Sequence, residues 1–321
     1  MRNQSLIFLL CVAWLIGPGN LIGQSPSKFI EPNTTTILFA ANDKDQKLVT
    51  TLRKEDIRVS EDGVPQQITR FESQVDIPIS LSILVDVSIS QERFIPMSKP
   101  ALLSFINSLL ASGKNRAAVV SFAGKAALKQ DLTANSGEVQ AAIQSLAFVP
   151  PPPLVKNRPA TKDEILLVAS AVWDTLWLTC DRIFPQPAAK SKQVIVIISD
   201  GSDTASKKEI GDAINRANRS AVAIYSVGVG DKKKFNLEKG LLNKVSEETG
   251  GRAFFPQTGN DLEAAFNAIE QELHSQYAVT YIPLTNKSNN GYRKLRIEII
   301  DPEKKKEKLK LIYQNRHFLG G

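Results

Sequence analysis

The stretch DVSIS, residues 86–90, places three oxygen-bearing side chains on alternate positions directly after an apolar run. Asp86 offers a carboxylate, and Ser88 and Ser90 offer hydroxyls. Oxygen ligands of this kind suit hard cations such as Mg²⁺, Mn²⁺ or Ca²⁺ rather than soft metals. Such a set would hold an ion without saturating it, so a carboxylate from elsewhere could take an open position. Taken alone, the stretch is also consistent with Ser88 and Gln91 forming a capping box for a following helix.

A second acid-bearing loop has the sequence SDGSDTAS, residues 199–206, and places Asp200 directly after the apolar run VIVIIS. In an open α/β sheet, ligands bind where loops separate at the carboxyl ends of the strands. If the two strands are neighbours, Asp86 and Asp200 meet at one edge. Asp203 lies just beyond and could orient water or contact a partner. Asp200 and Gly201 alone would be consistent with a simple turn.

Strands alternate with helices between Ile79 and Tyr277. The runs ISLSILVD and KQVIVIIS are continuously apolar, as expected of strands covered on both faces of a parallel sheet. Residues 164–184, EILLVASAVWDTLWLTCDRIF, read as one long apolar helix. Repeated βα units predict an α/β fold with a doubly wound, mostly parallel sheet. Short strands before and after this region predict a small β-rich module built from both flanks.

The first residues, MRNQSLIFLLCVAWLIGPGNLIGQ, combine an early Arg2 with an apolar run from Leu6 to Gly17. This pattern predicts a secretory signal peptide over residues 1–24, and hence an exported protein, secreted or periplasmic. If the segment is not cleaved, it would be an N-terminal membrane anchor. After cleavage we expect no stable membrane span. Only Cys180 would then remain, so an internal disulfide is excluded.

The composition also limits the classes of function. The formal net charge is +7, but the lysine runs at 232–234 and 304–310 carry no interleaved aromatic residues. Single-strand nucleic-acid binders use such aromatics for stacking, so solvated faces are expected here and no nucleic-acid partner. The chain has two histidines, His274 and His317, in unrelated settings. They offer almost no material for a zinc site or a Ser-His-Asp triad.

The two acid-bearing loops resemble those of the von Willebrand factor type A domain, whose metal-ion-dependent adhesion site binds a divalent cation. DVSIS is similar to the family's first metal loop, and SDGSDT to its last. The family's middle loop usually supplies a threonine. The matching stretch here is ASAVWDTL, aligned through Asp174, which places Ser170 at the threonine position. Serine keeps the hydroxyl but loses the methyl group that restricts the rotamer. A proline-rich loop before this stretch also departs from the family pattern.

The resemblance implies three direct ligands, Ser88, Ser90 and Ser170, with Asp86 and Asp200 acting directly or through water. It implies Mg²⁺ as the ion, with Mn²⁺ or Ca²⁺ as alternatives. It also implies a protein partner that presents an Asp or Glu. The flanks resemble those of exported bacterial proteins with a related domain, especially acidobacterial ones. On this basis the expected division is a signal peptide (1–24), an N-terminal β-rich segment (28–77), a type A domain (78–275) and C-terminal strands (276–321).

The function expected from these residues is a non-enzymatic, cation-dependent adhesion or assembly module. One alternative is a scaffold protein with a degenerate metal site, which the serine at position 170 would favour. Another is a metal-dependent phosphohydrolase. Phosphatases of the haloacid dehalogenase type need a second carboxylate two residues after the first, and Ser88 at that position cannot act as an acid or base near neutral pH.

Overall fold

The computed structural model describes residues 34–318, apart from 74, 149, 151–160, 189–190, 231–236 and 284–290. The predicted signal peptide, residues 1–24, lies outside the described residues. Among the residues that the structure does describe, no helix combines the length and the apolar character that a membrane crossing requires.

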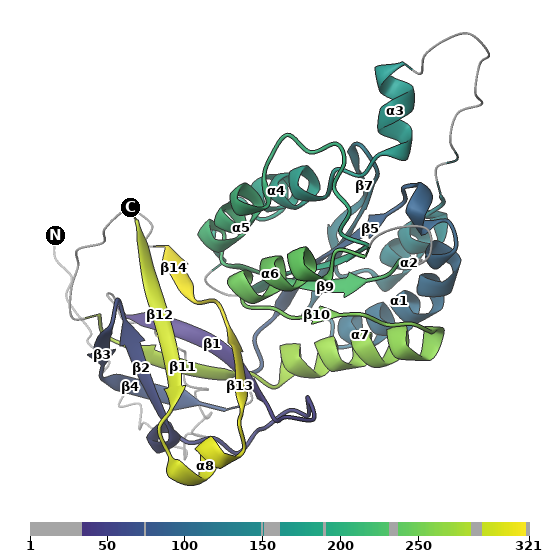
Figure 1. Ribbon diagram of the computed structural model, residues 1–321. Coiled ribbons are helices and arrows are strands. Elements are labelled where there is room, and N and C mark those ends of the chain that lie inside the picture. The colour runs from purple at the N-terminus through teal and green to yellow at the C-terminus, as the bar shows by residue number, and fades with distance from the viewer. Residues whose placement is uncertain are drawn as a thin grey trace, which may run out of the picture. The chain divides into compact units, whose positions relative to one another are not determined.

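A six-stranded sheet forms the centre of the α/β portion, with the strand order β10-β9-β8-β5-β6-β7 (Figure 1). Every neighbouring pair is parallel except β6 with β7, which is antiparallel. The predicted doubly wound, mostly parallel sheet is therefore confirmed. The strands are β5 (Ile79–Asp86), β6 (Arg116–Phe122), β7 (Ala126–Thr133), β8 (Lys192–Ser199), β9 (Val222–Gly228) and β10 (Ala253–Phe254).

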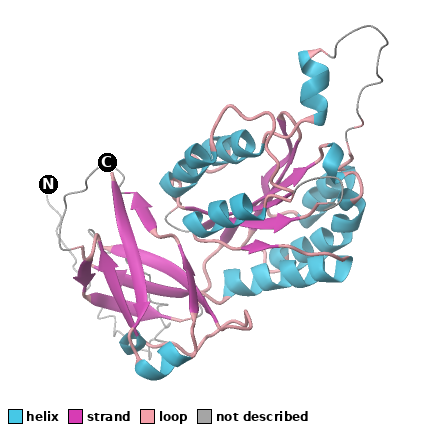
Figure 2. Cartoon of the chain, in the orientation of Figure 1, coloured by secondary structure: helices cyan, strands magenta, loops and turns pink. Residues whose placement is uncertain are grey.

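Helices cover both faces of this sheet (Figure 2). One face packs against α1 (Phe94–Leu110), α2 (Ser136–Ser145) and α7 (Gly259–His274). The other packs against α4 (Val172–Arg182), α5 (Ile210–Arg219) and α6 (Lys239–Thr249). Residues of β5 alternate between the two cores, with Leu81, Ile83 and Val85 on the first face and Leu84 on the second. This burial on both faces explains why β5 and β8 are apolar almost throughout.

The expectation of one long helix over residues 164–184 is wrong. The structure has two helices, α3 (Lys162–Val168) and α4, separated at Ala169, Ser170 and Ala171. Ala169 is extended, with φ −78° and ψ 169°, so the helix ends there. The break is stabilised from outside the segment, because the Ala171 N–H donates to the carbonyl of Ala123 over 2.8 Å. The apolar pattern therefore continues through a loop that tertiary contacts hold open.

Strands from the two ends of the described chain share two four-stranded sheets, which we call the β module. Their orders are β13-β1-β11-β4 and β14-β12-β2-β3. The core between them includes Phe39 stacked on Tyr277, with ring centroids 4.9 Å apart. The elements are β1 (Thr35–Asn42), the 3₁₀ turn η1 (Lys54–Asp56), β2 (Ile57–Glu61), β3 (Val64–Gln66), β4 (Ile68–Glu72), β11 (Tyr277–Tyr281), β12 (Tyr292–Ile299), α8 (Pro302–Lys306), β13 (Lys310–Tyr313) and β14 (Arg316–Phe318).

A buried polar cluster surrounds Glu272, near the end of α7. Its Oε1 lies 2.5 Å from Nη2 of Arg252 and accepts a hydrogen bond from Nδ2 of Asn42 over 2.9 Å. Lys192, the first residue of β8, is half-buried as a whole, but its Nζ is fully buried and has no hydrogen-bond partner. Burial lowers the pKa of Lys192 to about 7, although the charge of Glu272 opposes this effect. Asn42 belongs to β1, so the cluster ties the β module to the last helix of the α/β portion.

Candidate metal centre

The two acid-bearing loops lie at the same edge of the sheet. β5 and β8 are adjacent parallel strands, with Val85 opposite Ile198, so both end at this edge. Asp86 is the last residue of β5, and Asp200 directly follows β8. The structure thus brings together the two carboxylates that the sequence suggested would meet. Each is only 1% exposed.

Asp86 accepts hydrogen bonds from three directions. Its Oδ1 accepts the N–H of Ser88 over 2.9 Å. Its Oδ2 accepts two hydroxyls, from Ser199 over 2.7 Å and from Ser170 over 3.0 Å. Burial raises the pKa of Asp86 to about 6; the hydroxyl donors lower it, and the charge of Asp200 adds to the rise. The contribution from Asp200 indicates that the two carboxylates interact across the edge, as expected for like charges in a shared site.

Ser88 and Ser90 lie side by side, with their hydroxyl oxygens 3.2 Å apart. The turn that follows, Ile89–Gln91, is a short 3₁₀ helix with Ser88 as its N-cap residue, yet the Ser88 side chain makes no capping hydrogen bond. The capping-box interpretation therefore does not describe this loop. Instead, Gln91 donates from Nε2 to Ser90 Oγ and to the carbonyl of Val229, which fixes the loop to the end of β9.

Asp200 keeps one carboxylate oxygen without a hydrogen-bond donor. Oδ1 accepts the N–H of Ser202 over 2.9 Å, whereas Oδ2 is buried and has no hydrogen-bond partner. Burial raises the pKa of Asp200, while Ser90 and Gln91, which lie nearby, lower it. The influence of Ser90 places the two loops in direct proximity. A buried carboxylate oxygen without a donor is costly unless a positive charge compensates it.

Ser170 occupies the break between α3 and α4 and is 5% exposed. Its N–H donates to Oγ1 of Thr204 over 3.0 Å, and its carbonyl accepts the N–H groups of Thr204 and Ala205. These contacts hold the middle loop against the loop after β8. The Ser170 hydroxyl consequently points at Asp86 rather than facing solvent along a helix. All five predicted site residues lie in this one cluster.

Two acids near the site, Asp203 of the last loop and Asp174 of α4, have structural partners. Asp203 accepts the N–H of Val172 over 2.7 Å and the hydroxyl of Ser206 over 2.6 Å, so it anchors the start of α4. Asp174 accepts the N–H groups of Lys207 and Lys208. These contacts give Asp203 a positioning role within the loop, and the water-orienting or partner-contacting role that the sequence suggested stays a prediction.

The sequence reasoning gave three polar residues of the cluster no role at the metal site. Ser199 donates to Asp86, Thr204 holds Ser170, and Gln91 joins the first loop to β9. Ser199 had a usable signal, because a serine that ends a buried apolar strand beside Asp200 needs a partner at that edge. Thr204 and Gln91 had none, since their roles depend on segments distant in sequence.

The residues present fit a hard divalent cation. The described residues contain no group of three or more His, Cys, Asp or Glu side chains that could hold a metal ion. A cation here would therefore rest on hydroxyls and two carboxylates, which excludes the thiolate and imidazole sets that soft or borderline metals prefer. The unpartnered Oδ2 of Asp200 supplies a buried negative charge that such an ion would compensate.

Comparison with known proteins supports the same assignment of fold. The model of the von Willebrand factor type A domain family matches residues 81–268, which confirms the resemblance seen in the metal loops. No curated protein sequence matches the chain.

Three solved structures are similar to part of the chain. An aerotolerance-related membrane protein from Bacteroides fragilis, crystallised with multiple mutations to serine, has 19% identity and a TM-score of 0.45 over 61% of this chain and 98% of its own. The von Willebrand factor domain of the type V pili tip protein Mfa5 from Porphyromonas gingivalis has 13% identity and a TM-score of 0.45 over 61% and 95%. Proximal thread matrix protein 1 from the mussel byssus has 15% identity and a TM-score of 0.49 over 67% and 51%.

Proposed function

Because the chain belongs to the von Willebrand factor type A domain family, whose model matches more than half of it, we propose that it is a divalent-cation-dependent protein-binding module. Binding of a partner protein, in adhesion or assembly, is its function, and it is not an enzyme. One observation carries the proposal. Two buried carboxylates and three serine hydroxyls converge at one sheet edge, and Asp200 Oδ2 has no hydrogen-bond donor there.

The roles of the residues follow from their surroundings. Ser88 and Ser90 are direct ligands, because their hydroxyl oxygens lie together beside Asp200. Ser170, whose hydroxyl donates to Asp86, would be the third hydroxyl ligand. Asp86 and Asp200 supply negative charge, directly or through water. When bound, the cation neutralises these carboxylates and offers an open position to an Asp or Glu of the partner protein.

Mg²⁺ is the ion that we propose. It keeps several waters when bound by few protein ligands, which suits a site with two carboxylates and neutral hydroxyls. Mn²⁺ and Ca²⁺ share the preference for oxygen and are the alternatives. The unfavourable burial of two like charges provides the driving force for cation binding.

We place the protein outside the cytoplasm, secreted or periplasmic, on the basis of the predicted signal peptide.

Calorimetric titration of the chelator-treated protein with Mg²⁺ tests the site. The intact chain should bind one ion, and Asp86→Ala should abolish the signal. Because Asp86 is buried and hydrogen-bonded, Asp200→Asn is a second variant that keeps the shape of the side chain. It should weaken binding at least tenfold. Asp45→Asn removes the same charge from an exposed residue whose carboxylate faces Lys44, and should leave the affinity unchanged. A flat trace for the intact protein would favour the scaffold alternative.

Partner binding and catalysis need separate experiments. A pull-down from the extracytoplasmic fraction should capture a partner with Mg²⁺ and release it with a chelator, and Asp200→Asn should capture none. A phosphatase screen with added metal should be blank. Turnover that is lost on Asp86→Asn would overturn the binding-module proposal in favour of the phosphohydrolase.

A further inference from the structure

A second candidate binding site lies in the β module. Helix α8 and the strands β12 and β13 border a cavity of about 370 Å³. Its apolar lining includes Ile299, Leu309, Leu311 and Tyr313, which are half-buried and pack against the core of the β module. Lys304, Lys305 and Lys308 also line it. The cavity therefore combines an apolar floor with ammonium groups.

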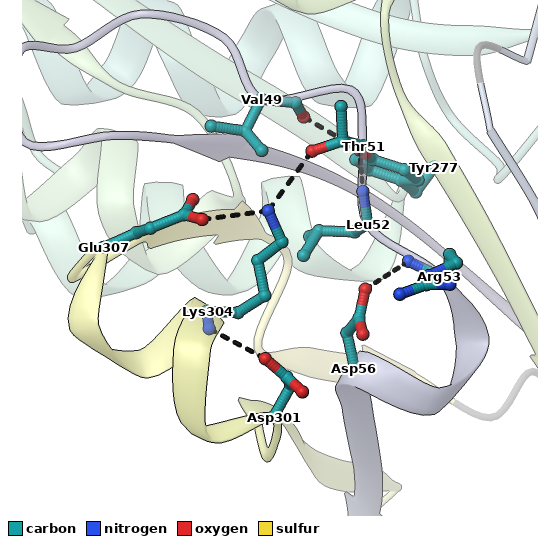
Figure 3. Close-up of polar contacts among 9 residues, drawn as sticks. All are labelled: Val49, Thr51, Leu52, Arg53, Asp56, Tyr277, Asp301, Lys304 and Glu307. Carbon is teal, nitrogen blue, oxygen red and sulfur yellow. Dashed lines mark hydrogen bonds and ion pairs between the residues drawn. The ribbon is translucent and has the colours of Figure 1, made fainter.

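Helix α8 is held in place by polar contacts of Lys304 (Figure 3). Asp301 caps its first turn by accepting the N–H of Lys304 over 2.8 Å. The side chain of Lys304 reaches Glu307 over 2.9 Å and the hydroxyl of Thr51 over 3.4 Å. The loop that carries Thr51 is itself held, because the Tyr277 hydroxyl donates to the carbonyl of Val49 and accepts the N–H of Leu52 (Figure 3).

The glutamates of this segment already form ion pairs with lysines of the same segment. Glu303 pairs with Lys306, and Glu307 pairs with Lys304. Lys305 and Lys308 are exposed, and the side chain of neither makes a hydrogen bond or ion pair with any described residue. The two lysines that line the cavity without an internal partner thus leave a net positive charge at its rim.

The backbone at Lys308 is also unusual. Its φ is +52°, in the left-handed region, at the first position beyond the C-cap of α8. Glycine or asparagine is normally favoured at this position because a Cβ is strained there. A lysine here gives up stability and gains a positive charge beside the cavity.

We propose that this lysine-rimmed cavity binds an anionic phospholipid at a membrane surface. Lys305 and Lys308 contact the phosphate, and the glycerol and first methylene groups lie against Ile299, Leu309 and Leu311. A phosphate without an apolar portion would leave the floor of the cavity unused. Single-stranded nucleic acid would need several aromatic faces for stacking, and Tyr313 is the one aromatic residue of the lining. The inference does not depend on the metal centre.

Vesicle co-sedimentation of the full chain tests the inference. The vesicles are phosphatidylcholine alone and phosphatidylcholine mixed with phosphatidylglycerol. Any binding through the apolar N-terminal run is common to both and to all variants, so the measured quantity is the extra binding to the mixed vesicles. A lysine near an anionic surface contributes about 1 kcal/mol, so Lys305→Gln with Lys308→Gln should lower this partition coefficient about 30-fold.

The matched control is Lys244→Gln with Lys294→Gln, two exposed lysines that line no described cavity. It removes the same charge and should change the partition coefficient less than about threefold. Circular dichroism should show both double variants folded. Equal losses in the two pairs would mean diffuse attraction to the net charge and would overturn the proposal. Equal binding of the intact chain to both vesicle types would also overturn the proposal. Release of the vesicle-bound chain by excess soluble glycerol phosphate would overturn it as well. We expect glycerol phosphate to have no effect.

Discussion

Replacing Lys192 with methionine should stabilise the protein, and the gain should depend on pH. The Nζ of Lys192 is buried without a hydrogen-bond partner, and its pKa falls to about 7 from the ordinary 10.5. Each pKa unit corresponds to about 1.4 kcal/mol, so burying the charged form costs roughly 4 kcal/mol at pH 7. Methionine keeps the apolar stem without the charge. This pKa already includes the attraction to Glu272, so we expect Lys192→Met to raise the free energy of unfolding by roughly 4 kcal/mol at pH 7.

The pH dependence has a definite sign. Between pH 7 and 10.5 the unfolded chain holds the Lys192 proton and the folded chain releases it, so the stability of the native protein rises with pH. From pH 7 to 8.5 the expected rise is about 1.5 kcal/mol. Other groups also contribute to the pH dependence. The pKa of Asp86 is raised to about 6, and burial lowers the pKa of His317 from 6.5. Burial also raises the pKa of Cys180 to about 12, so this thiol lowers stability as the pH rises towards 9 and above.

Urea unfolding followed by tryptophan fluorescence at intervals from pH 7 to 8.5 measures both effects. The native chain should become more stable across the series, while Lys192→Met should start higher and stay flat. Lys244→Met removes an exposed lysine on α6 and should reproduce the native slope. If the native chain and Lys192→Met gave parallel profiles, the assignment of a buried, proton-releasing Lys192 would be refuted.

Three further substitutions test the fold and the metal centre. Gly251→Ala would place a Cβ 2.0 Å from the carbonyl oxygen of Ile224, so it should lower the free energy of unfolding by about 3 kcal/mol; a change below about 1 kcal/mol in urea unfolding would contradict this. Thr204→Val removes the acceptor of the Ser170 N–H and should cost about 1–2 kcal/mol of stability and weaken Mg²⁺ binding in calorimetry. An unchanged affinity would show that this contact does not position Ser170. Ser170→Thr restricts the rotamer and should tighten Mg²⁺ binding a few-fold; weaker binding would mean that the added methyl is not accommodated.

The convergence of Asp86 and Asp200 could be predicted because it depends on a strong local signal. Each follows an apolar run that only a doubly covered strand explains, and parallel neighbours end at the same edge. The alternation of strands and helices constrained the fold in the same way. The family resemblance then added Ser170, which lies in a segment whose apolar pattern predicts an unbroken helix.

The break that exposes Ser170 to the site could not be predicted from local pattern, because its cause is remote in sequence. The N–H of Gly124 donates to the carbonyl of Leu166, and the N–H of Ala171 donates to the carbonyl of Ala123. A Cβ on Gly124 would lie 2.2 Å from the Leu166 oxygen, so only glycine allows this approach. The positions of Ser199 and Thr204 depend on the same assembled loops. Tertiary hydrogen bonds thus override helical periodicity where the site is built.

The pairing of β4 with β11 has a consequence for how such a chain can be rearranged. Glu72 near the end of one strand lies opposite Ala278 near the start of the other, in antiparallel register. The residues between Glu72 and Ala278, which include the α/β portion, are therefore inserted where an ordinary hairpin would need only a tight turn. Recombination or engineering could exchange that insert for another, or delete it, and leave the host sheet with the same neighbours. The β module would then be a constant host for different inserted domains.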